Sequence, residues 1–219
     1  MFDQATVGLL AKGLLESLYM VLVSTLLAYI IGLPLGILLV VTDKDGIRPA
    51  VGLNRTLGFI VNILRSVPFL ILLVALIPFT RAIVGTTIGS TATIVPLVIG
   101  SAPFIARLVE SSIKEIDRGV IEAAQSMGAS PIKIIYKVML PEAKPALIVN
   151  GAIAITTILS YSALAGFVGG GGLGTIAINY GYHRYQTNIM LVTVVLLVIL
   201  VQVFQEIGMK IARSTDKRL

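Results

Sequence analysis

Cysteine is absent from this sequence, and histidine occurs once, as His183. The lack of cysteine excludes disulfides and thiolate-ligated metals. A single histidine also argues against a histidine-based metal site and against a Ser-His-Asp triad. The pattern G-x-x-x-x-G-K-[S/T], which binds nucleotide phosphates in P-loop ATPases, occurs nowhere in the chain. The sequence therefore predicts a protein that holds no metal and hydrolyses no ATP itself.

Charged residues are also scarce, at 13% of the chain, whereas a soluble domain contains about 25%. Hydrophobic residues make up 56% of the 219 residues, and the mean hydropathy is +0.97. This excess of apolar residues does not fit one soluble core, which indicates lipid as the solvent. The net charge of +6 follows from the positive-inside bias of membrane proteins, without any nucleic acid. The first residues lack a basic segment and a cleavage site, so we expect no cleavable signal peptide.

Long uncharged stretches predict an all-α polytopic membrane protein. A helix needs about 20 apolar residues to cross the hydrocarbon core, and five stretches meet or approach that length. We expect one transmembrane domain over residues 1–219, with spans at about 18–41, 57–79, 82–106, 146–167 and 187–204.

Lysine and arginine placement predicts the orientation of these spans. The connection after the first span, the connection after the third and the C-terminal tail carry most of the cations, so we place all three in the cytoplasm. Only Lys12, Arg81 and Arg184 then fall outside. With five spans, the N-terminus lies outside and the C-terminus inside.

The connection between the third and fourth spans, at about 111–144, is unusually long. An ordinary helix–helix connection needs about 2–8 residues. Its small residues Ala123, Ala124, Gly128 and Ala129 permit another surface to approach closely, and lysines flank an apolar strip. The segment is either a solvated hairpin or a docking surface for a partner.

Local signals predict two short helices in this connection. Asp117 is a suitable N-cap for the first helix, and Gly128 suits the left-handed residue that ends one. Ser130 and Pro131 then restart a helix, with serine as the N-cap and proline at the first helical position. We expect Pro141 to end the second helix, because proline disfavours helix at the residue before it.

The spacing Glu-Ala-Ala, three residues, Gly, nine residues, an aliphatic residue, one residue and Leu-Pro runs from Glu122 to Pro141. It resembles the EAA loop of permease subunits of bacterial ABC importers, with Val138 in place of the usual isoleucine. The resemblance implies a type I ABC importer permease fold. It also implies a coupling helix, about Ser130 to Lys137, that docks in a cleft of a separate ATPase subunit. The residues implied in this coupling are Glu122, Ala123, Ala124, Gly128, Ala129, Ser130, Pro131, Ile132, Lys133 and Pro141.

From about Leu14 onward, the chain is similar to a narrower group, the permeases of methionine-uptake systems. The matching stretches are RSVPF (65–69), IPFTRAIVGTTIG (77–89), APFIARLVE (102–110) and GGGGLGTIAINYGYHRYQ (169–186). This resemblance implies a multi-pass subunit of the bacterial cytoplasmic membrane that imports L-methionine, and D-methionine as a further candidate, by alternating access. The implied partners are a second copy of this chain, two ATPase subunits that hold the ATP, and an extracytoplasmic methionine-binding protein or lipoprotein.

Three alternatives stay open at this point. Another small solute fits an ABC permease equally well, because specificity in such systems resides largely in the binding protein. An ion-driven secondary transporter would need acidic residues near the bilayer midplane, whereas Glu16, Glu110 and Glu206 lie near the ends of spans. A membrane anchor without transport would leave the long connection without a partner.

A charge in the second span is a further candidate site. Arg65 lies roughly 12 Å inside that span, where a charge either snorkels to the interface or serves a function. Asn62 and Ser66 share its side, and Pro68 frees a backbone carbonyl. These four residues are candidates for an internal polar network that braces a helix kink or lines the translocation pathway.

The fourth span contains the other polar patch, formed by Thr156, Thr157, Ser160, Tyr161 and Ser162. Such groups either line a pathway for a zwitterionic solute or form hydrogen bonds to neighbouring helices. Ser160, Tyr161 and Ser162 are the pathway candidates.

The glycine cluster at 169–174 contains G-x-G-x-x-G, but no predicted strand precedes it and no acidic residue follows at the needed distance. We therefore interpret the dinucleotide pattern as accidental. The cluster maps outside the cell, where Gly170, Gly172, Tyr180 and Tyr182 are candidates for contact with the binding protein. The tyrosines fit an interfacial aromatic belt equally well.

Two spacings predict helix contacts. Gly32 and Gly36 form a G-x-x-x-G pattern, which is typical of a close-packing helix face. Arg107 and Glu110 are three residues apart, and we expect a plain surface pair between them.

Overall fold

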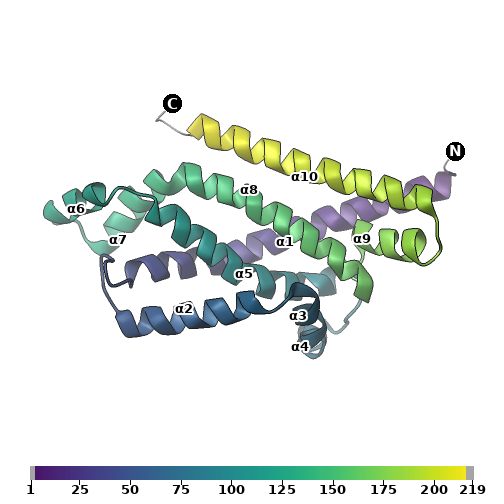
Figure 1. Ribbon diagram of the computed structural model, residues 1–219, viewed down its shortest axis with the longest axis horizontal. Coiled ribbons are helices and arrows are strands. Elements are labelled where there is room, and N and C mark those ends of the chain that lie inside the picture. Colours follow the sequence, from purple (N-terminus) through teal and green to yellow (C-terminus); the bar gives the residue numbers. More distant parts are fainter. Residues whose placement is uncertain (1–2, 216–219) are drawn as a thin grey trace. The chain divides into compact units, whose positions relative to one another are not determined.

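A computed structural model describes residues 3–215, and all regular secondary structure in that range is helical. The predicted all-α class is therefore confirmed. In chain order (Figure 1), the elements are α1 (Gln4–Val41), α2 (Val51–Ser66), α3 (Phe69–Ala75), α4 (Ile77–Val84), α5 (Ser90–Lys114), α6 (Arg118–Ser126), α7 (Pro131–Ile134), the π turn η1 (Ile135–Met139), α8 (Leu140–Leu164), the 3-10 turn η2 (Ala165–Val168), α9 (Gly172–Ile176), the π turn η3 (Ala177–Tyr182) and α10 (Thr187–Thr215).

Within the described residues, α1, α5, the run Pro131–Tyr182 and α10 are long and apolar enough to cross a membrane. The pair α2 and α3 makes a fifth span if the two are taken as one broken span. The predicted number of five agrees with this upper count.

The second span does not have its predicted shape. The chain bends by 97° between α2 and α3, which is far more than a helix kink within the span expected at 57–79. Pro68 explains the break: its backbone has φ −57° and ψ 132°, and proline forces the preceding residue away from the helical region. The residues on both sides of Pro68 are apolar, so nothing in the sequence indicates how large the bend is.

The third span is displaced along the chain, since helix α5 covers 90–114 instead of 82–106. Residues 82–84 belong to α4, which ends at Gly85 with φ +81°. The remaining helices are longer than the expected hydrophobic stretches, because good helix-forming residues continue beyond the apolar windows at 18–41, 146–167 and 187–204.

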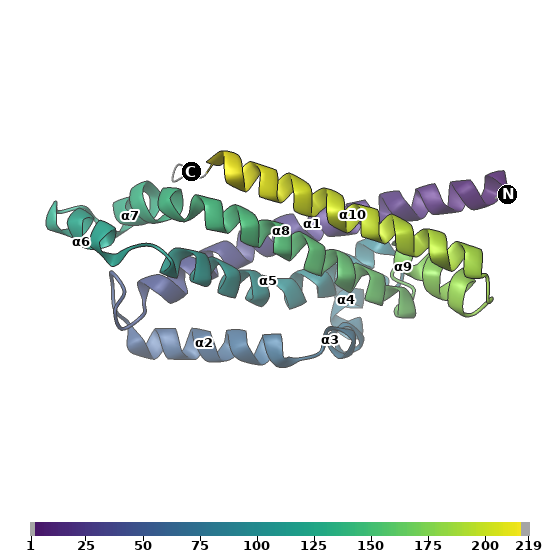
Figure 2. The ribbon, with the colours of Figure 1, turned by 45° about the horizontal axis from the view of Figure 1, so that its top comes forward.

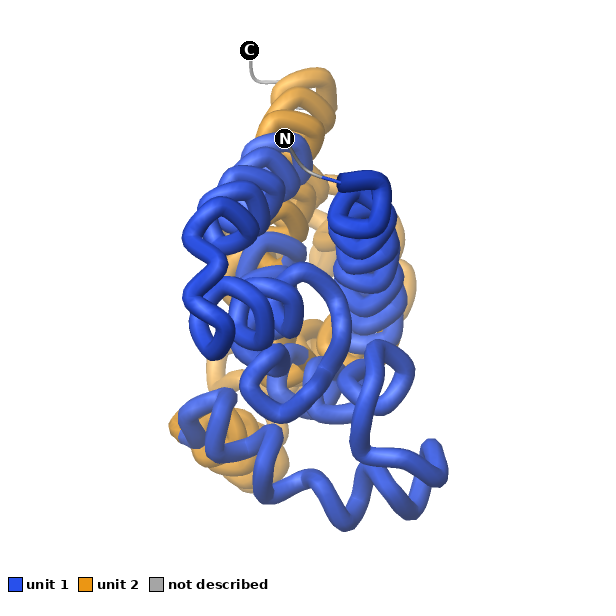
Figure 3. Tube along the Cα trace, turned by 90° about the vertical axis from the view of Figure 1, so that its right-hand side faces the viewer, with its two compact units in different colours: residues 1–28, 67–101, 155–205 blue, residues 29–66, 102–154, 206–219 orange. Residues whose placement is uncertain are grey.

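The chain divides into two compact units, distinguished in Figure 3. Unit 1 comprises Met1–Ala28, Val67–Ser101 and Ile155–Gln205, and unit 2 comprises Tyr29–Ser66, Ala102–Ala154 and Glu206–Leu219. Helices α1, α5, α8 and α10 contribute to both units.

Two glycines bring α1 and α5 together within unit 2. A Cβ added at Gly32 would lie 2.8 Å from the carbonyl oxygen of Ala102, and one at Gly36 would lie 2.5 Å from that of Ala106. These distances leave no room for a side chain, so only glycine permits the contact. The predicted close-packing face is confirmed, and its partner is α5.

Unit 1 has an apolar cluster that joins three helices. Leu10 of α1, Ile176 of α9 and Ile189 of α10 are buried together, and Tyr180 packs against them. In both ribbon views, α9 and η3 lie beside the first turns of α10 (Figures 1 and 2). The glycine-rich segment is thereby part of a packed structure.

Candidate functional site

The segment between α5 and α8, residues 115–139, begins with a capped helix. The Asp117 carboxylate accepts a 2.7 Å hydrogen bond from the backbone N–H of Gly119. This confirms the predicted N-cap and places the start of α6 at Arg118. Glu122 and Ala123 of this helix are exposed, whereas Ala124 is buried. We refer to residues 115–139 as the α6–α7 segment.

The corner after α6 is a tightly bonded turn. Gly128 has φ +74°, its N–H donates to the carbonyl of Gln125 at 2.9 Å, and the N–H of Ala129 donates to the carbonyl of Ala124 at 3.2 Å. These two bonds form a Schellman motif, which ends a helix at a left-handed residue. The prediction for Gly128 is confirmed, and the turn fixes the direction in which α7 leaves α6.

The helix after the corner continues further than predicted. Ser130 and Pro131 occupy the N-cap and first helical positions, although the Ser130 side chain makes no capping hydrogen bond. The helix does not end at Pro141, because α7 runs through η1 into α8. The N–H of Leu140 bonds to the carbonyl of Ile135, five residues earlier. This wider turn changes the position of the carbonyls opposite the Pro141 ring, which lets the helix pass a proline.

Three large apolar side chains are the most exposed ones of the α6–α7 segment. Met127 is 81% exposed, Ile132 is 70% exposed and Tyr136 is 67% exposed. Ile134 and Met139 are buried and anchor the same segment to unit 2. We call Met127, Ile132 and Tyr136 the apolar surface. Exposed apolar groups on an anchored turn are typical of an interaction site.

The residues expected to couple to a partner are mostly available to one. All of them are exposed except Ala124, which is buried, and Ala129, which is half-buried. The carbonyl of Ala124 accepts a hydrogen bond from the Ala129 N–H in the corner turn. Pro141 is exposed but lies inside the continuous helix α8.

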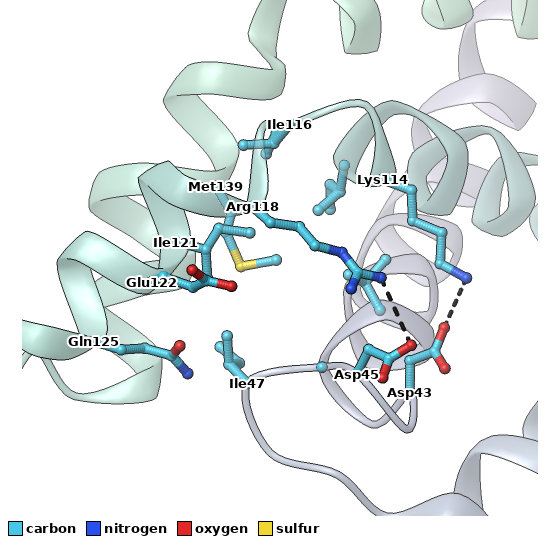
Figure 4. A pocket seen from close by; sticks show the side chains of 13 residues that line it. Asp43, Asp45, Ile47, Lys114, Ile116, Arg118, Ile121, Glu122, Gln125 and Met139 are labelled. Carbon is cyan, nitrogen blue, oxygen red and sulfur yellow. Dashed lines mark ion pairs between the residues drawn. The ribbon is translucent and has the colours of Figure 1, made fainter.

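A cavity of about 340 Å³ lies beside α6. Figure 4 shows Asp43 and Asp45 of the α1–α2 connection on one side, and Glu122 of α6 on the other. Lys114 Nζ lies 2.8 Å from Asp43 Oδ2, and Arg118 Nη2 lies 3.6 Å from Asp45 Oδ2. The hydrogen bond from Lys114 lowers the pKa of Asp43 below its ordinary value. Charge pairs therefore join the α1–α2 connection to the end of α5 and to α6.

Comparison with known proteins identifies the family. Residues 32–212 match the family described as binding-protein-dependent transport system inner membrane component. The chain belongs to this family. It is accordingly a multi-pass inner membrane component of a transport system and not an enzyme.

Individual relatives extend the match to nearly the whole chain. A probable D-methionine transport system permease protein MetI of Vibrio cholerae serotype O1 is 54% identical over 210 residues, which are 96% of this chain and 93% of the relative. Its counterpart in Pasteurella multocida is 45% identical over 96% of this chain and 97% of the relative. A solved inward-facing structure of the MetNI methionine ABC transporter has a chain that superposes with a TM-score of 0.97, at 49% identity, over 99% of this chain and 100% of that one. The fold of this inner membrane component is thus that of a type I ABC importer permease.

The polar network of this transport component is built around Arg107, not around Arg65. Arg107 Nη2 donates to the Gly58 carbonyl at 3.1 Å and to Asn62 Oδ1 at 2.8 Å, and Nη1 lies 2.6 Å from Glu110 Oε2. The Glu110 side chain is only 12% exposed. The expectation of a plain surface pair between Arg107 and Glu110 is therefore wrong. These contacts between α2 and α5 join residues that lie 45 or more positions apart in the sequence. No local spacing predicts them.

Arg65 lies outside this network. Its side chain is exposed, and within residues 3–215 it forms no hydrogen bond or ion pair. It stands in the last turn of α2, where the helix dipole favours a cation. Ser66 Oγ donates to the carbonyl of Asn62 at 2.7 Å, within its own helix. Of the four predicted network residues, only Asn62 joins another helix through a side-chain hydrogen bond.

The polar patch of α8 divides between two environments. Ser160 is exposed and donates to the carbonyl of Thr156 at 3.1 Å. Ser162 is buried and donates to the carbonyl of Leu159 at 2.7 Å. Tyr161 stacks on Phe69, with ring centroids 4.3 Å apart. Ser160 therefore stays the best-placed candidate for the pathway.

The glycine cluster is packed inside unit 1. Gly170 and Gly172 are buried. A Cβ at Gly170 would lie 2.7 Å from Thr93 Oγ1, and one at Gly172 would lie 2.6 Å from Ser17 Oγ. The structure does not support contact of these two glycines with a binding protein, because their surroundings are already occupied by this chain.

The sequence did not reveal how α1 fastens the glycine cluster. Glu16 Oε2 accepts a 2.8 Å hydrogen bond from the Gly172 N–H, and Ser17 Oγ accepts one of 2.9 Å from the Leu173 N–H. These bonds satisfy the first N–H groups of α9, as an N-cap does, but from residues 156 positions away. No short motif signals such a distant cap.

The tyrosines remain candidates for contact with a partner. Tyr182 is 61% exposed. Tyr180 is half-buried, and the guanidinium carbon of Arg184 lies 4.5 Å from its ring centroid. Aromatic residues beside arginine are typical of the residues that carry most binding energy in interfaces.

Proposed function

We propose that this chain is the membrane-spanning permease of an ATP-driven methionine importer. The observation that carries the proposal is the likeness to the MetNI methionine ABC transporter structure, at 49% identity over 99% of the chain with a TM-score of 0.97. Relatives named as probable D-methionine permeases at 54% and 45% identity support the same solute. In this function, the chain moves methionine by alternating access, and a partner hydrolyses the ATP.

The α6–α7 segment is the proposed contact with the ATPase subunit, on the cytoplasmic face. Its apolar surface can insert into a cleft, and the exposed Lys133 beside it can orient the partner. The corner at Gly128 holds α7 at a set angle to α6. Because the helix continues from Pro131 into α8, a push on α7 reaches a membrane span directly.

The proposed assembly contains two copies of this chain, two ATPase subunits and an extracytoplasmic methionine-binding protein or lipoprotein. Tyr180 and Tyr182 are the proposed contacts with the binding protein. The N-terminus lies outside and the C-terminus inside, so that these tyrosines and the α6–α7 segment face opposite compartments.

The docking proposal is tested by Ile132→Asp. A carboxylate introduced at this exposed position must be desolvated when the ATPase binds, so we expect affinity for the ATPase to fall by about tenfold or more. Val51→Asp, at an exposed apolar position in the first turn of α2 and outside the α6–α7 segment, is the matched control and should bind normally. Co-purification and titration of the ATPase in detergent measure both variants. Equal binding by the two variants would remove α7 from the interface.

Competition experiments test the solute. Uptake of radiolabelled L-methionine should be suppressed by excess unlabelled L-methionine and D-methionine, and unaffected by leucine or glutamate. The experiment uses a bacterial strain that lacks other methionine transporters and expresses this importer. Uptake of labelled L-methionine no higher than in cells without this chain would assign the importer to another solute.

A further inference from the structure

Helix α2 is held within unit 2 mainly by polar contacts. Val61 is its buried residue among those described, while Phe59 is 66% exposed and Ile63 is 48% exposed. Asn54 Nδ2 donates to the Leu39 carbonyl at 2.6 Å, at the end of α1. Apolar burial gives little driving force between helices in a membrane, so these hydrogen bonds contribute to the position of α2.

A row of charges on α5 supplies those contacts. Arg107, Glu110 and Lys114 recur at intervals of three and four residues, so they share one face of the helix. Glu110 is the centre: Oε2 lies 2.6 Å from Arg107 Nη1, and Oε1 lies 2.9 Å from Lys114 Nζ. Its 12% exposure means that the carboxylate is largely shielded from water, which strengthens both pairs.

Each of the two cations reaches another part of unit 2. Arg107 bonds to the Gly58 carbonyl and to Asn62 in the middle of α2. Lys114 pairs with Asp43 in the α1–α2 connection, at 2.8 Å. The α1–α2 connection and the middle of α2 are thus both fastened to α5, by two cations that share the Glu110 carboxylate. We call Asp43, Lys114, Glu110, Arg107 and Asn62 the charge ladder.

The charge ladder begins where the α6–α7 segment departs. Lys114 is the last residue of α5, and α6 starts four positions later at Arg118. Arg118 in turn lies 3.6 Å from Asp45, in the same connection as Asp43. A displacement of α6 therefore acts on the α1–α2 connection from two sides.

We propose that Glu110 is a positioning residue for energy coupling, which holds α2 and the α1–α2 connection to α5 so that ATPase-driven movement of the α6–α7 segment carries them as one body. This inference rests on the proposed function. It adds that coupling depends on a side chain that the ATPase does not touch.

Glu110→Gln tests the proposal, because it removes the charge and preserves the shape. The variant, co-reconstituted with its ATPase, should hydrolyse ATP within about twofold of the wild-type rate while methionine uptake per ATP falls by about tenfold, within the usual range of coupling effects. Glu206→Gln is the matched control. Glu206 is exposed, lies in α10 within the same unit and belongs to no ion pair among the described residues; this variant should keep the wild-type ratio.

A merely structural role would lower thermal stability and leave uptake per ATP unchanged, and that result would overturn the proposal. If Glu110→Gln fails to insert, Asp43→Asn decides the question, because it cuts the ladder at the other end and leaves the Arg107–Glu110 pair intact. A normal uptake-to-ATP ratio in Asp43→Asn then overturns the proposal. Failure of the wild-type chain to bind any ATPase would instead refute the proposed function.

The absence of cysteine permits a direct measurement of the movement. Spin labels on cysteines introduced at Phe59 of α2 and Ser111 of α5, both exposed, report the distance between these helices. In the otherwise wild-type chain, the distribution of distances between the two labels should be the same with and without ATP. In Glu110→Gln, this distribution should broaden. Identical distributions in both backgrounds would contradict the role of the ladder.

Discussion

At the scale of single residues, Gly128 is where backbone geometry and the proposed coupling coincide. Its φ of +74° is one that side chains with a Cβ rarely adopt, and a Cβ built there meets no atom of this chain within 4 Å. Any defect of a substitution therefore comes from the backbone or from a partner. Gly85 offers the same two properties at the end of α4, with φ +81°.

Gly128→Val should uncouple transport. Valine at positive φ costs about 1–2 kcal/mol or more, and relief of that strain turns α7 relative to α6. We expect the thermal stability of Gly128→Val and Gly85→Val to fall by similar amounts, whereas uptake per ATP falls about tenfold in Gly128→Val alone. Unfolding curves and uptake in proteoliposomes measure the two properties. Equal ratios of uptake to ATP hydrolysis in the two variants would show that the corner at Gly128 does not transmit movement.

The ion pair of Asp43 predicts how the stability of the folded chain depends on pH. Its pKa is lowered in the folded chain by the hydrogen bond from Lys114, so its stabilising effect is fully present above the ordinary carboxyl pKa of about 3.9. The effect is lost as the pH falls through the lowered pKa. Asp43→Asn should therefore unfold more easily by roughly 0.5–1 kcal/mol at pH 7, and this difference should shrink below pH ~4. A difference that instead grows toward acid pH would contradict the assigned pair.

At the scale of elements, caps were predictable, whereas the strength of each proline's effect on its helix was not. Asp117, Gly128 and the Ser130–Pro131 pair mark helix ends through bonds within a few residues, so sequence spacing is sufficient to place them. Pro68 breaks the second span, yet Pro141 lies inside a continuous helix. The difference depends on whether neighbouring carbonyls can shift, as in the π turn before Pro141, and that is decided by packing.

The cap that α1 provides for α9 gives a prediction at this scale. Ser17→Ala leaves the Leu173 N–H unpaired in a buried site, which should destabilise the chain by about 1–2 kcal/mol. Ser214→Ala removes a hydroxyl that bonds only within its own exposed helix turn and should change stability by less than about 0.5 kcal/mol. Thermal unfolding in detergent compares them. A larger loss in Ser214→Ala would refute the importance of the distant cap.

At the scale of the whole molecule, the composition and the Glu122–Pro141 spacing were sufficient to predict the helical class, the family and the exposed position of the α6–α7 segment. The charge ladder was not predictable. Arg107 and Asn62 stand 45 residues apart in sequence, and nothing local distinguishes Arg107 from Arg65, which the same reasoning chose instead. Side-chain networks between helices are set by tertiary packing, and a single sequence does not display it.

We propose that ATP hydrolysed by a partner drives methionine through this chain. The most direct measurement is uptake of radiolabelled L-methionine into liposomes that contain this chain with its ATPase, with the binding protein added outside. We predict accumulation only when Mg²⁺ and ATP are enclosed in the liposomes, and accumulation that persists when ionophores collapse every ion gradient. Uptake that proceeds without ATP, or that stops with the ion gradient while ATP is present, would rule out ATP-driven transport by this chain.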